Sequence, residues 1–239
     1  MTFTKSLIGA AAIAAVTLSA GNASAVFYAD MTDNGAVWTL AGAGATTNAP
    51  LPGFGTVTAT ASASPITQTI FDGNTVPAFV PPLAGLFDGF GVKDDEITDP
   101  GQSITVSWAN PVNIVAIYLL DFFSNNSNSG DPSWTEEATI TIGGVTATFD
   151  AVENVNKTGD FTITAADLIL QGINVNGVSS ILFEAPSVTG CTLTDGKGCN
   201  DYAVAGIAAV PLPGAVWLFG SGLLAMLGIG YTRRRRAAA

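Results

Sequence analysis

Residues 26–209 are a succession of short runs of β-forming residues, each ended by Gly, Pro, Asn or Asp. Apolar and polar residues alternate over 103–108 and 138–142, which indicates strands with one buried face. Residues 142–145, Ile-Gly-Gly-Val, predict a hairpin with a two-glycine turn. The more continuously apolar run 113–122 predicts a central strand. Strands this short and closely spaced favour an all-β fold, an antiparallel sandwich.

About eight strands are expected in this body, and some 180 residues suffice to bury a full core. The strands are predicted over 56–61, 103–108, 113–122, 138–142, 145–149, 161–164, 179–183 and 202–207. One short helix is predicted over 165–171, and the Gly- and Ala-rich region before residue 55 is expected to be looser.

The body is strongly acidic. All 19 acidic residues lie between Asp30 and Asp201 together with only three lysines, which gives this part of the chain a formal charge of −16. Such a surface repels phosphate backbones, so nucleic-acid binding is not expected. The chain contains no histidine. Ser-His-Asp and Cys-His nucleophile systems and His-containing zinc sites are therefore excluded.

The N-terminal segment has the three parts of a secretory signal peptide. Lys5 precedes an uncharged apolar run at 7–18, and small residues at Ala23 and Ala25 fit the cleavage rule of signal peptidase. We expect cleavage after Ala25, so the body would fold outside the cytoplasm, where cysteines oxidise.

The C-terminal segment predicts a single membrane-spanning helix. Residues 214–231 carry no charge, and as a helix they would reach about 27 Å, close to the thickness of the hydrocarbon core. A basic cluster follows, made of Arg233, Arg234, Arg235 and Arg236. The positive-inside rule places this stop-transfer cluster in the cytoplasm and the acidic body outside.

A short proline motif stands before this apolar segment, formed by Val210, Pro211, Leu212 and Pro213. The order of motif, apolar helix, arginine cluster and chain end resembles the PEP-CTERM sorting signal in its VPLPA variant, with Gly214 where that variant usually has Ala. The resemblance covers 210–236. It implies a bacterium that makes exopolysaccharide and a membrane sorting enzyme, an exosortase, that cuts near the motif. The protein would pass from a transient inner-membrane form to the cell surface or extracellular matrix.

Three stretches of the body, 89–97, 103–106 and 200–207, resemble the ectodomains of many PEP-CTERM proteins. That resemblance implies a jelly-roll-like sandwich and no particular activity. The expected organisation is a signal peptide at 1–25, a β-sandwich ectodomain at 26–209 and a sorting signal at 210–236.

An acidic loop precedes the strand that starts at Ser103. Its carboxylates are Asp94, Asp95, Glu96 and Asp99. Crowded oxygen donors suit Ca²⁺, which would serve as a structural ion. A solvated acidic loop without a metal is the alternative that the same residues allow.

Cys191 and Cys199 lie near each other, on either side of Thr-Leu-Thr-Asp-Gly-Lys-Gly. In an exported protein this spacing predicts a disulfide bond, with Asp195 and Gly196 in the turn. A catalytic thiol is not expected without a histidine to activate it.

Five aromatic residues could present a face on which sugars stack or could fill the core: Trp108, Tyr118, Phe122, Phe123 and Trp134. Trp134 follows a polar stretch at 124–133 and is the candidate for exposure. Glu136 and Glu137 are adjacent and would face opposite sides of a strand, which is poor geometry for an acid–base pair.

These features predict an exported surface or exopolysaccharide-matrix protein with a structural or glycan-binding role. No residue is assigned a catalytic role. The alternative is a carboxylate-based extracellular glycan hydrolase or lyase, which would need two carboxyl groups about 5–10 Å apart across a cleft.

Overall fold

The computed structural model describes residues 25–33, 38, 44–63, 65–68, 83, 87–93, 96–98, 101–124, 135–152, 159–187 and 200–212. Within these ranges the chain is β-structure with one short helix, and every pair of strands is antiparallel. The prediction of an all-β, antiparallel fold is confirmed.

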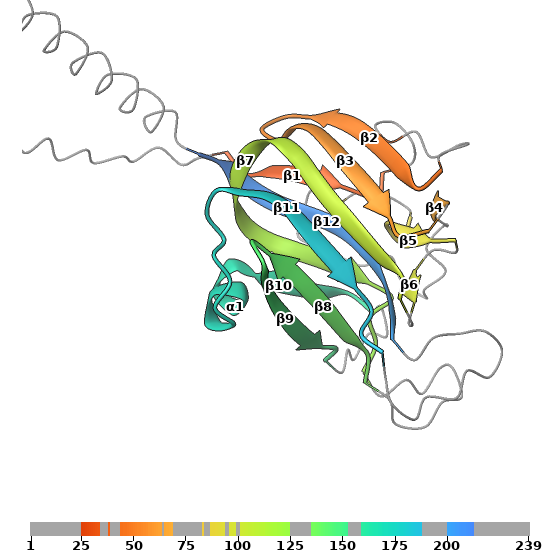
Figure 1. Cartoon of the computed structure of the whole chain (residues 1–239). Helices are drawn as coiled ribbons and strands as arrows, with labels where there is room; N and C mark the ends of the chain where they lie inside the picture. Colours follow the sequence, from red (N-terminus) through yellow and green to blue (C-terminus); the bar gives the residue numbers. More distant parts are fainter. Residues whose placement is uncertain are drawn as a thin grey trace, which may run out of the picture.

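Figure 1 shows the order of the elements along the chain. The strands are β1 (Phe27–Asp30), β2 (Thr46–Leu51), β3 (Gly55–Ala61), β4 (Ile66–Thr67), β5 (Gly91–Val92), β6 (Ile97–Thr98), β7 (Ser103–Leu120), β8 (Glu137–Ile142), β9 (Val145–Asp150), β10 (Phe161–Thr164), β11 (Val178–Glu184) and β12 (Asp201–Pro211). Helix α1 (Ala165–Leu170) joins β10 to β11.

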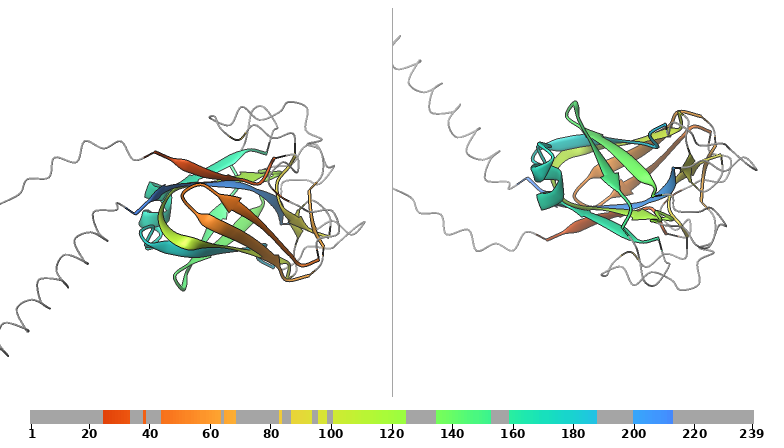
Figure 2. Two further views of the ribbon diagram at one scale, coloured as in Figure 1. Left: turned by 90° about the horizontal axis from the view of Figure 1, so that it is seen from above. Right: turned by 90° about the horizontal axis from the view of Figure 1, so that it is seen from below.

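The long strand β7 belongs to both layers of the fold. Its first part pairs with β3 and β11, and its second part pairs with β12 and β10. One layer therefore has the order β2-β3-β7-β11-β8-β9 and the other β1-β12-β7-β10. Figure 2 shows the two layers facing each other, which makes a sandwich-like arrangement.

The prediction of separate strands at 103–108 and 113–122 was wrong, because the structure has one continuous strand there. Residues 109–111 are exposed at the point where β7 changes partners. Pro111 has no N–H to donate, which makes it look like a strand end in the sequence. It is tolerated because it lies at this exposed corner.

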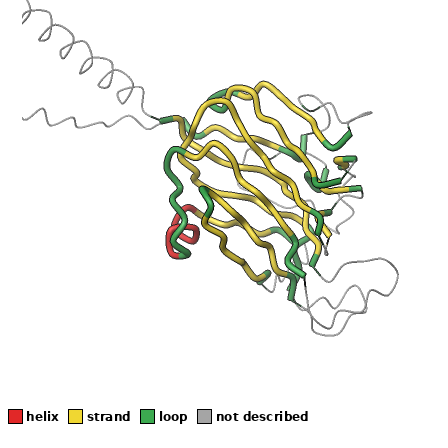
Figure 3. The backbone as a smooth tube through the Cα atoms, viewed as in Figure 1, coloured by secondary structure: helices red, strands yellow, loops and turns green. Residues whose placement is uncertain are grey.

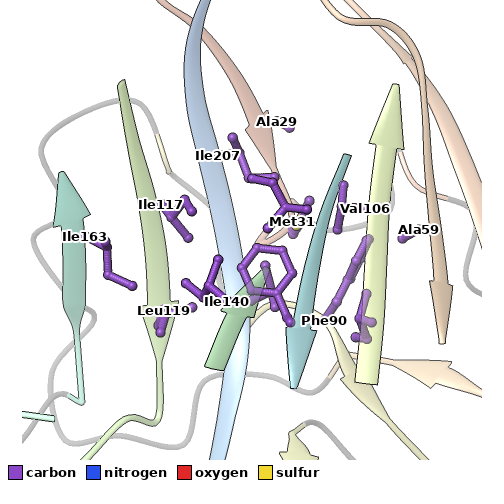
Figure 4. Close-up of a cluster of buried hydrophobic side chains, with 14 of the residues drawn as sticks. Ala29, Met31, Ala59, Phe90, Val106, Ile117, Leu119, Ile140, Ile163 and Ile207 are labelled. Atoms are coloured by element: carbon purple, nitrogen blue, oxygen red, sulfur yellow. The ribbon is translucent and has the colours of Figure 1, made fainter. Parts of the chain in front are cut away.

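The core lies between the two layers. In β7, Ile104, Val106 and Trp108 point inward and are 0%, 0% and 6% exposed, as their alternation predicted. Figure 4 shows labelled core side chains that come from β1, β12, β7 and β10 in one layer and from β3, β7 and β8 in the other. The whole sandwich therefore shares one main hydrophobic core.

Two local predictions are confirmed. Ile142 pairs with Val145 across a turn in which Gly143 and Gly144 have φ of 60° and 81°, the backbone that a two-glycine hairpin turn requires. The predicted helix is α1, which Thr164 and Asp167 begin with a reciprocal capping box.

Before residue 55, the described ranges 25–33 and 44–54 are more regular than predicted. β1 pairs with β12, and β2 pairs with β3 over its full length, from Thr46↔Thr60 to Leu51↔Gly55. β12 is also longer than the predicted strand at 202–207. It continues through Val210 and Pro211, which pair with Asn113 and Val112, so the expected boundary at residue 209 falls inside a strand.

The strands run between two ends of the sandwich, as the traced backbone shows (Figure 3). At one end the described chain begins at Ala25 and finishes at Leu212, because Phe27 lies opposite Ala209. We call this the exit end; it comprises 25–27, 51–55, 108–115, 164–178 and 209–212. The opposite end, which we call the acidic end, comprises 88–98, 121–124, 135–137, 150, 159–160, 184–187 and 200–202 where described.

No helix among the described residues is long and apolar enough to cross a membrane. The predicted signal peptide before Ala25 and the predicted membrane helix at 214–231 lie outside the described residues.

Candidate functional site

The acidic end gathers carboxyl groups from elements that are distant in sequence. The end of β7, the start of β8 and the start of β12 meet here, and β6 pairs with β12 through Asp201↔Thr98 and Tyr202↔Ile97. Ser124 and Thr135 form an isolated bridge that closes the same region. This end is the candidate functional site because it brings Asp201 and Glu96 within electrostatic reach of Glu136.

Glu136 is the centre of this group. Only 6% of the residue is exposed, and its side chain accepts a hydrogen bond from the backbone N–H of Phe123. Burial raises the pKa of the Glu136 carboxyl well above its ordinary value, and the charge of Asp201 raises it further. A side-chain hydrogen bond with Asp201 acts in the same direction. Two carboxyl groups can share a hydrogen bond only while one of them carries a proton, so the pair holds a proton when this bond is formed.

Backbone bonds hold Glu136 in place. Its N–H donates to the carbonyl of Phe123 at 3.1 Å, and its carbonyl accepts from the N–H of Ala151 at 2.8 Å. The side chain and the main chain of Glu136 thus both contact Phe123. These bonds hold the carboxyl group of Glu136 beside the turn that follows β7.

Asn200 joins three chain segments at this end. Its side-chain carbonyl accepts from the N–H of Glu137 at 2.9 Å, and its amide donates to the carbonyl of Pro186 at 2.6 Å. The residue is fully buried. The starts of β8 and β12 and the chain after β11 are therefore fixed relative to one another.

Tyr202 extends the same framework into the core. Its hydroxyl donates to the carbonyl of Glu184 at 2.9 Å, and its ring lies edge-on to Phe122 with centroids 5.8 Å apart. Burial, and secondarily the charge of Glu184, raise the pKa of Tyr202 well above its ordinary value. The hydroxyl is a fixed donor here and not a titrating group.

The turn after β7 is built on an unusual backbone. Asp121 has a positive φ of 52°, and the N–H of Phe122 donates to the carbonyl of Gly159 at 3.0 Å. A side chain on Gly159 would come within 2.9 Å of the Cα of Asp121. Glycine is required at 159 so that this segment can lie directly against the end of β7.

Of the predicted calcium-binding residues, the structure places one. Glu96 is half-buried, and its carbonyl accepts from the N–H of Val92 at 2.9 Å. Asp94, Asp95 and Asp99 lie outside the described residues. Within the described ranges no three carboxylate or cysteine side chains are grouped closely enough to hold a metal ion.

The other predicted site residues are mostly not described. Trp134, Cys191 and Cys199 lie outside the described residues, and so do Ala23, Pro213 and the four arginines Arg233, Arg234, Arg235 and Arg236. The structure does describe the residues that flank the segments containing Trp134 and the cysteine pair. Residues 125–134 connect Ser124 to Thr135, and 188–199 connect Ser187 to Asn200, so both segments start and finish at the acidic end.

Two of the aromatic residues proposed for sugar stacking are core residues. Trp108 packs edge-on to Phe54, with centroids 5.5 Å apart, and donates its indole N–H to the carbonyl of Val178 at 2.8 Å. Phe122 is 1% exposed. The core interpretation is confirmed for both.

The sequence did contain a pattern that identifies Glu136. Ala138, Ile140 and Ile142 are the buried face of β8, and Glu136 stands two residues before them in the same alternation. A carboxyl group in phase with a buried face needs a partner inside the protein. The expectation that Glu136 and Glu137 face opposite sides is consistent with this, since Glu137 is half-buried in β8 and Glu136 is buried.

The chemistry that this site allows follows from the contact between the two carboxyl groups. Glu136 and Asp201 touch through a hydrogen bond, whereas the carboxyl pairs of glycoside hydrolases stand about 5–10 Å apart with substrate between them. The pair can share and release a proton, and its geometry is not that of an acid and a nucleophile flanking a glycosidic bond.

Comparisons of the chain with models of known protein families, with curated proteins and with solved structures find no match.

Proposed function

We propose that this chain is an exported, jelly-roll-like surface or matrix protein with a structural or glycan-binding role, held first in the inner membrane and then processed by an exosortase. The proposal combines the sequence features of the two termini with the acidic end of the sandwich.

One observation carries the proposal. Phe27, two residues after the predicted signal-peptidase site, pairs with Ala209, directly before the predicted sorting motif, so the start of β1 and the end of β12 lie side by side at the exit end (Figure 1). A protein attached to one membrane, first through its N-terminus and then through its C-terminus, needs both attachment points on the same side of its fold. The pairing of β1 with β12 supplies this arrangement.

In the proposed membrane-attached form, the acidic end, which lies opposite the exit end, would face away from the membrane. The segments 94–95, 99–100, 125–134 and 188–199 are all flanked by residues of that end. They contain three of the four predicted calcium ligands, Asp94, Asp95 and Asp99, and also Trp134 and the cysteine pair. In this proposal, ligands meet the protein at the acidic end, in the surrounding medium or matrix.

Processing is tested in the native host by separating membrane, surface and medium fractions. We expect a full-length membrane form and a shorter form without 214–239. A double Pro211→Ala, Pro213→Ala variant should accumulate the membrane form, and a Pro186→Ala variant serves as a control outside the motif. If the mature surface protein of wild-type cells still carries 214–239, the sorting proposal fails.

Glycan binding is tested with the processed protein purified from the host, on an array of exopolysaccharide fragments with and without EDTA. Retention of a defined class of glycan supports a binding role. Shortened or unsaturated glycan products would instead support the alternative, a hydrolase or lyase.

A further inference from the structure

The charges of the described chain are distributed unevenly between the two ends of the sandwich. The exit end comprises 35 described residues and contains one charged residue among them, Asp167. The Asp167 carboxylate is already engaged, because it accepts hydrogen bonds from the N–H and the hydroxyl of Thr164 at 2.8 and 2.6 Å. The exposed polar groups of this end are otherwise uncharged, such as Asn110, Gln171 and Asn174. This composition removes the repulsion that an acidic surface would meet at anionic lipid headgroups.

The exit end also carries exposed apolar side chains. Helix α1 buries Leu168 but leaves Ile169 57% and Leu170 84% exposed. Val115 and Val26, which are 37% and 39% exposed, belong to the same end. In all three views α1 lies at the end of the sandwich where β1 begins and β12 finishes (Figures 1 and 2).

Hydrogen bonds fix the loop after α1 against the corner of β7 that meets the end of β12. The N–H of Ile114 donates to the carbonyl of Val175 at 2.8 Å, and the N–H of Gly177 donates to the Asn113 side chain at 3.0 Å. Asn113 is also the partner of Val210 in the sheet. The exposed face of α1 is therefore part of a rigid end that includes the start of the predicted sorting motif.

The distance from this end to the apolar C-terminal segment is short. β12 finishes at Pro211, and the uncharged run starts at residue 214. Two residues beyond Leu212 span at most about 7 Å even when fully extended. The polar headgroup layer on each side of the hydrocarbon core is about 5–8 Å thick. A sandwich attached this closely has its exit end at the level of the headgroups.

We propose that the exit end rests on the lipid bilayer while the C-terminal segment is in the membrane, with Ile169 and Leu170 inserted into the headgroup region. This inference rests on the proposed membrane-attached form. Uncharged amides contact the headgroups around the two apolar side chains, and the acidic end faces away. The contact fixes the orientation of the sandwich in addition to its distance from the membrane, and it presents the proline motif at the bilayer surface.

The experiment uses the full mature chain in nanodiscs of phosphatidylethanolamine and phosphatidylglycerol. The photoreactive residue p-benzoyl-phenylalanine replaces Leu170, Val152 or Leu224 in separate samples, and mass spectrometry detects the adducts. Val152 is the matched control, since it is 58% exposed and lies next to Ala151, which is bonded to Glu136 of the acidic end. Leu224 reports on the predicted membrane segment itself.

We expect lipid adducts at 170 and 224 and only background at 152. Adducts at 224 without adducts at 170 would overturn the docking of α1 and leave membrane attachment intact. Absence of lipid adducts at 224 would overturn the membrane-attached form itself. Adducts of position 170 to a second copy of the chain would show that the exit end is a self-association surface, which also contradicts the proposal.

Discussion

Glu136, the residue directly before β8, shares a hydrogen bond through its buried carboxyl group with the carboxyl group of Asp201, the first residue of β12. The contact joins the two layers of the sandwich at the acidic end. It makes the stability of this end depend on a proton, and it does so in a protein without histidine.

This pair predicts a pH dependence of folding. Because the pKa of Glu136 is raised in the folded protein, mainly by burial and then by Asp201, the folded state binds the proton more tightly than the unfolded chain does. The unfolded carboxyl titrates near pH ~4.3. The stabilising contribution is therefore complete below that pH and is lost as the pH rises through the folded-state pKa.

The variant Glu136→Gln tests this dependence. Its amide can donate to Asp201 at every pH, so we expect its free energy of unfolding to fall less than that of the wild type as the pH is raised from about 4 to 8. Urea denaturation at a series of pH values gives the measurement. The half-buried neighbour provides a control, since Glu137→Gln should follow the wild-type curve. Parallel curves for wild type and Glu136→Gln would contradict the assignment.

A second prediction concerns Asn200. Replacing it with Ala removes the acceptor of the Glu137 N–H and the donor to the Pro186 carbonyl, and the site is fully buried. The free energy of unfolding should fall by about 2–5 kcal/mol, since both groups lose their partner inside the protein. Asn176→Ala, at an exposed turn where the amide contacts only Asn174, should cost about 0.5 kcal/mol or less. Equal losses in the two variants would show that Asn200 does not hold the three segments together.

The sequence predicted those parts of the fold in which a single strand shows its own buried face. β8 is an example, because Ala138, Ile140 and Ile142 alternate with threonines and form the buried row. β2 is the opposite case. Its residues, Thr-Thr-Asn-Ala-Pro-Leu, have weak strand propensity, and it forms because β3 supplies a full antiparallel partner. No local pattern contains that information.

The candidate site also contains residues that a local pattern identifies and contacts that only the folded chain creates. Glu96 was identified as part of a local run of carboxylates, whereas Asp201 and Glu136 are 65 residues apart in the numbering of the chain and meet only after β7, β8 and β12 have assembled. The burial of Glu136 could be predicted from its phase with β8. Its partner could not, because the pairing of β12 with β6 and β7 depends on long-range register.

The disulfide remains a prediction. Cys191 and Cys199 are expected to be paired in the exported protein, and mass spectrometry without reduction should find their peptide two hydrogens lighter than the dithiol. Opening this short loop by reduction should lower the free energy of unfolding by about 2–3 kcal/mol. A double Cys191→Ser, Cys199→Ser variant should reproduce that loss and should not respond to reductant. Full labelling of both thiols in folded, unreduced protein would contradict the pairing.

Calcium binding by Asp94, Asp95, Glu96 and Asp99 is also a prediction. An ion that binds only the folded state raises its stability by mass action, so the melting temperature should rise in millimolar Ca²⁺ and return to its starting value on addition of EDTA. The double variant Asp94→Asn, Asp95→Asn should lose this response, and Asp30→Asn, outside the acidic end, should keep it. Identical melting curves of the wild type with Ca²⁺ and with EDTA would favour the solvated acidic loop.

The last prediction follows from the position of the sorting motif in the sheet. Val210 and Pro211 are paired with Asn113 and Val112 of β7, so an enzyme that binds the motif as a free extended chain must first open the end of β12. Inserting Gly-Ser-Gly-Ser between Ala209 and Val210 separates the motif from β7 and removes this step, since a Gly/Ser-rich linker behaves as a random coil. The rate of processing in the native host, measured by pulse-chase labelling, should be higher in this variant than in the wild type. The same four residues inserted between Gly143 and Gly144, in the hairpin turn of β8 and β9, should leave the rate unchanged. An unchanged rate in the first variant would mean that the enzyme accepts the motif while it is still paired in the sheet.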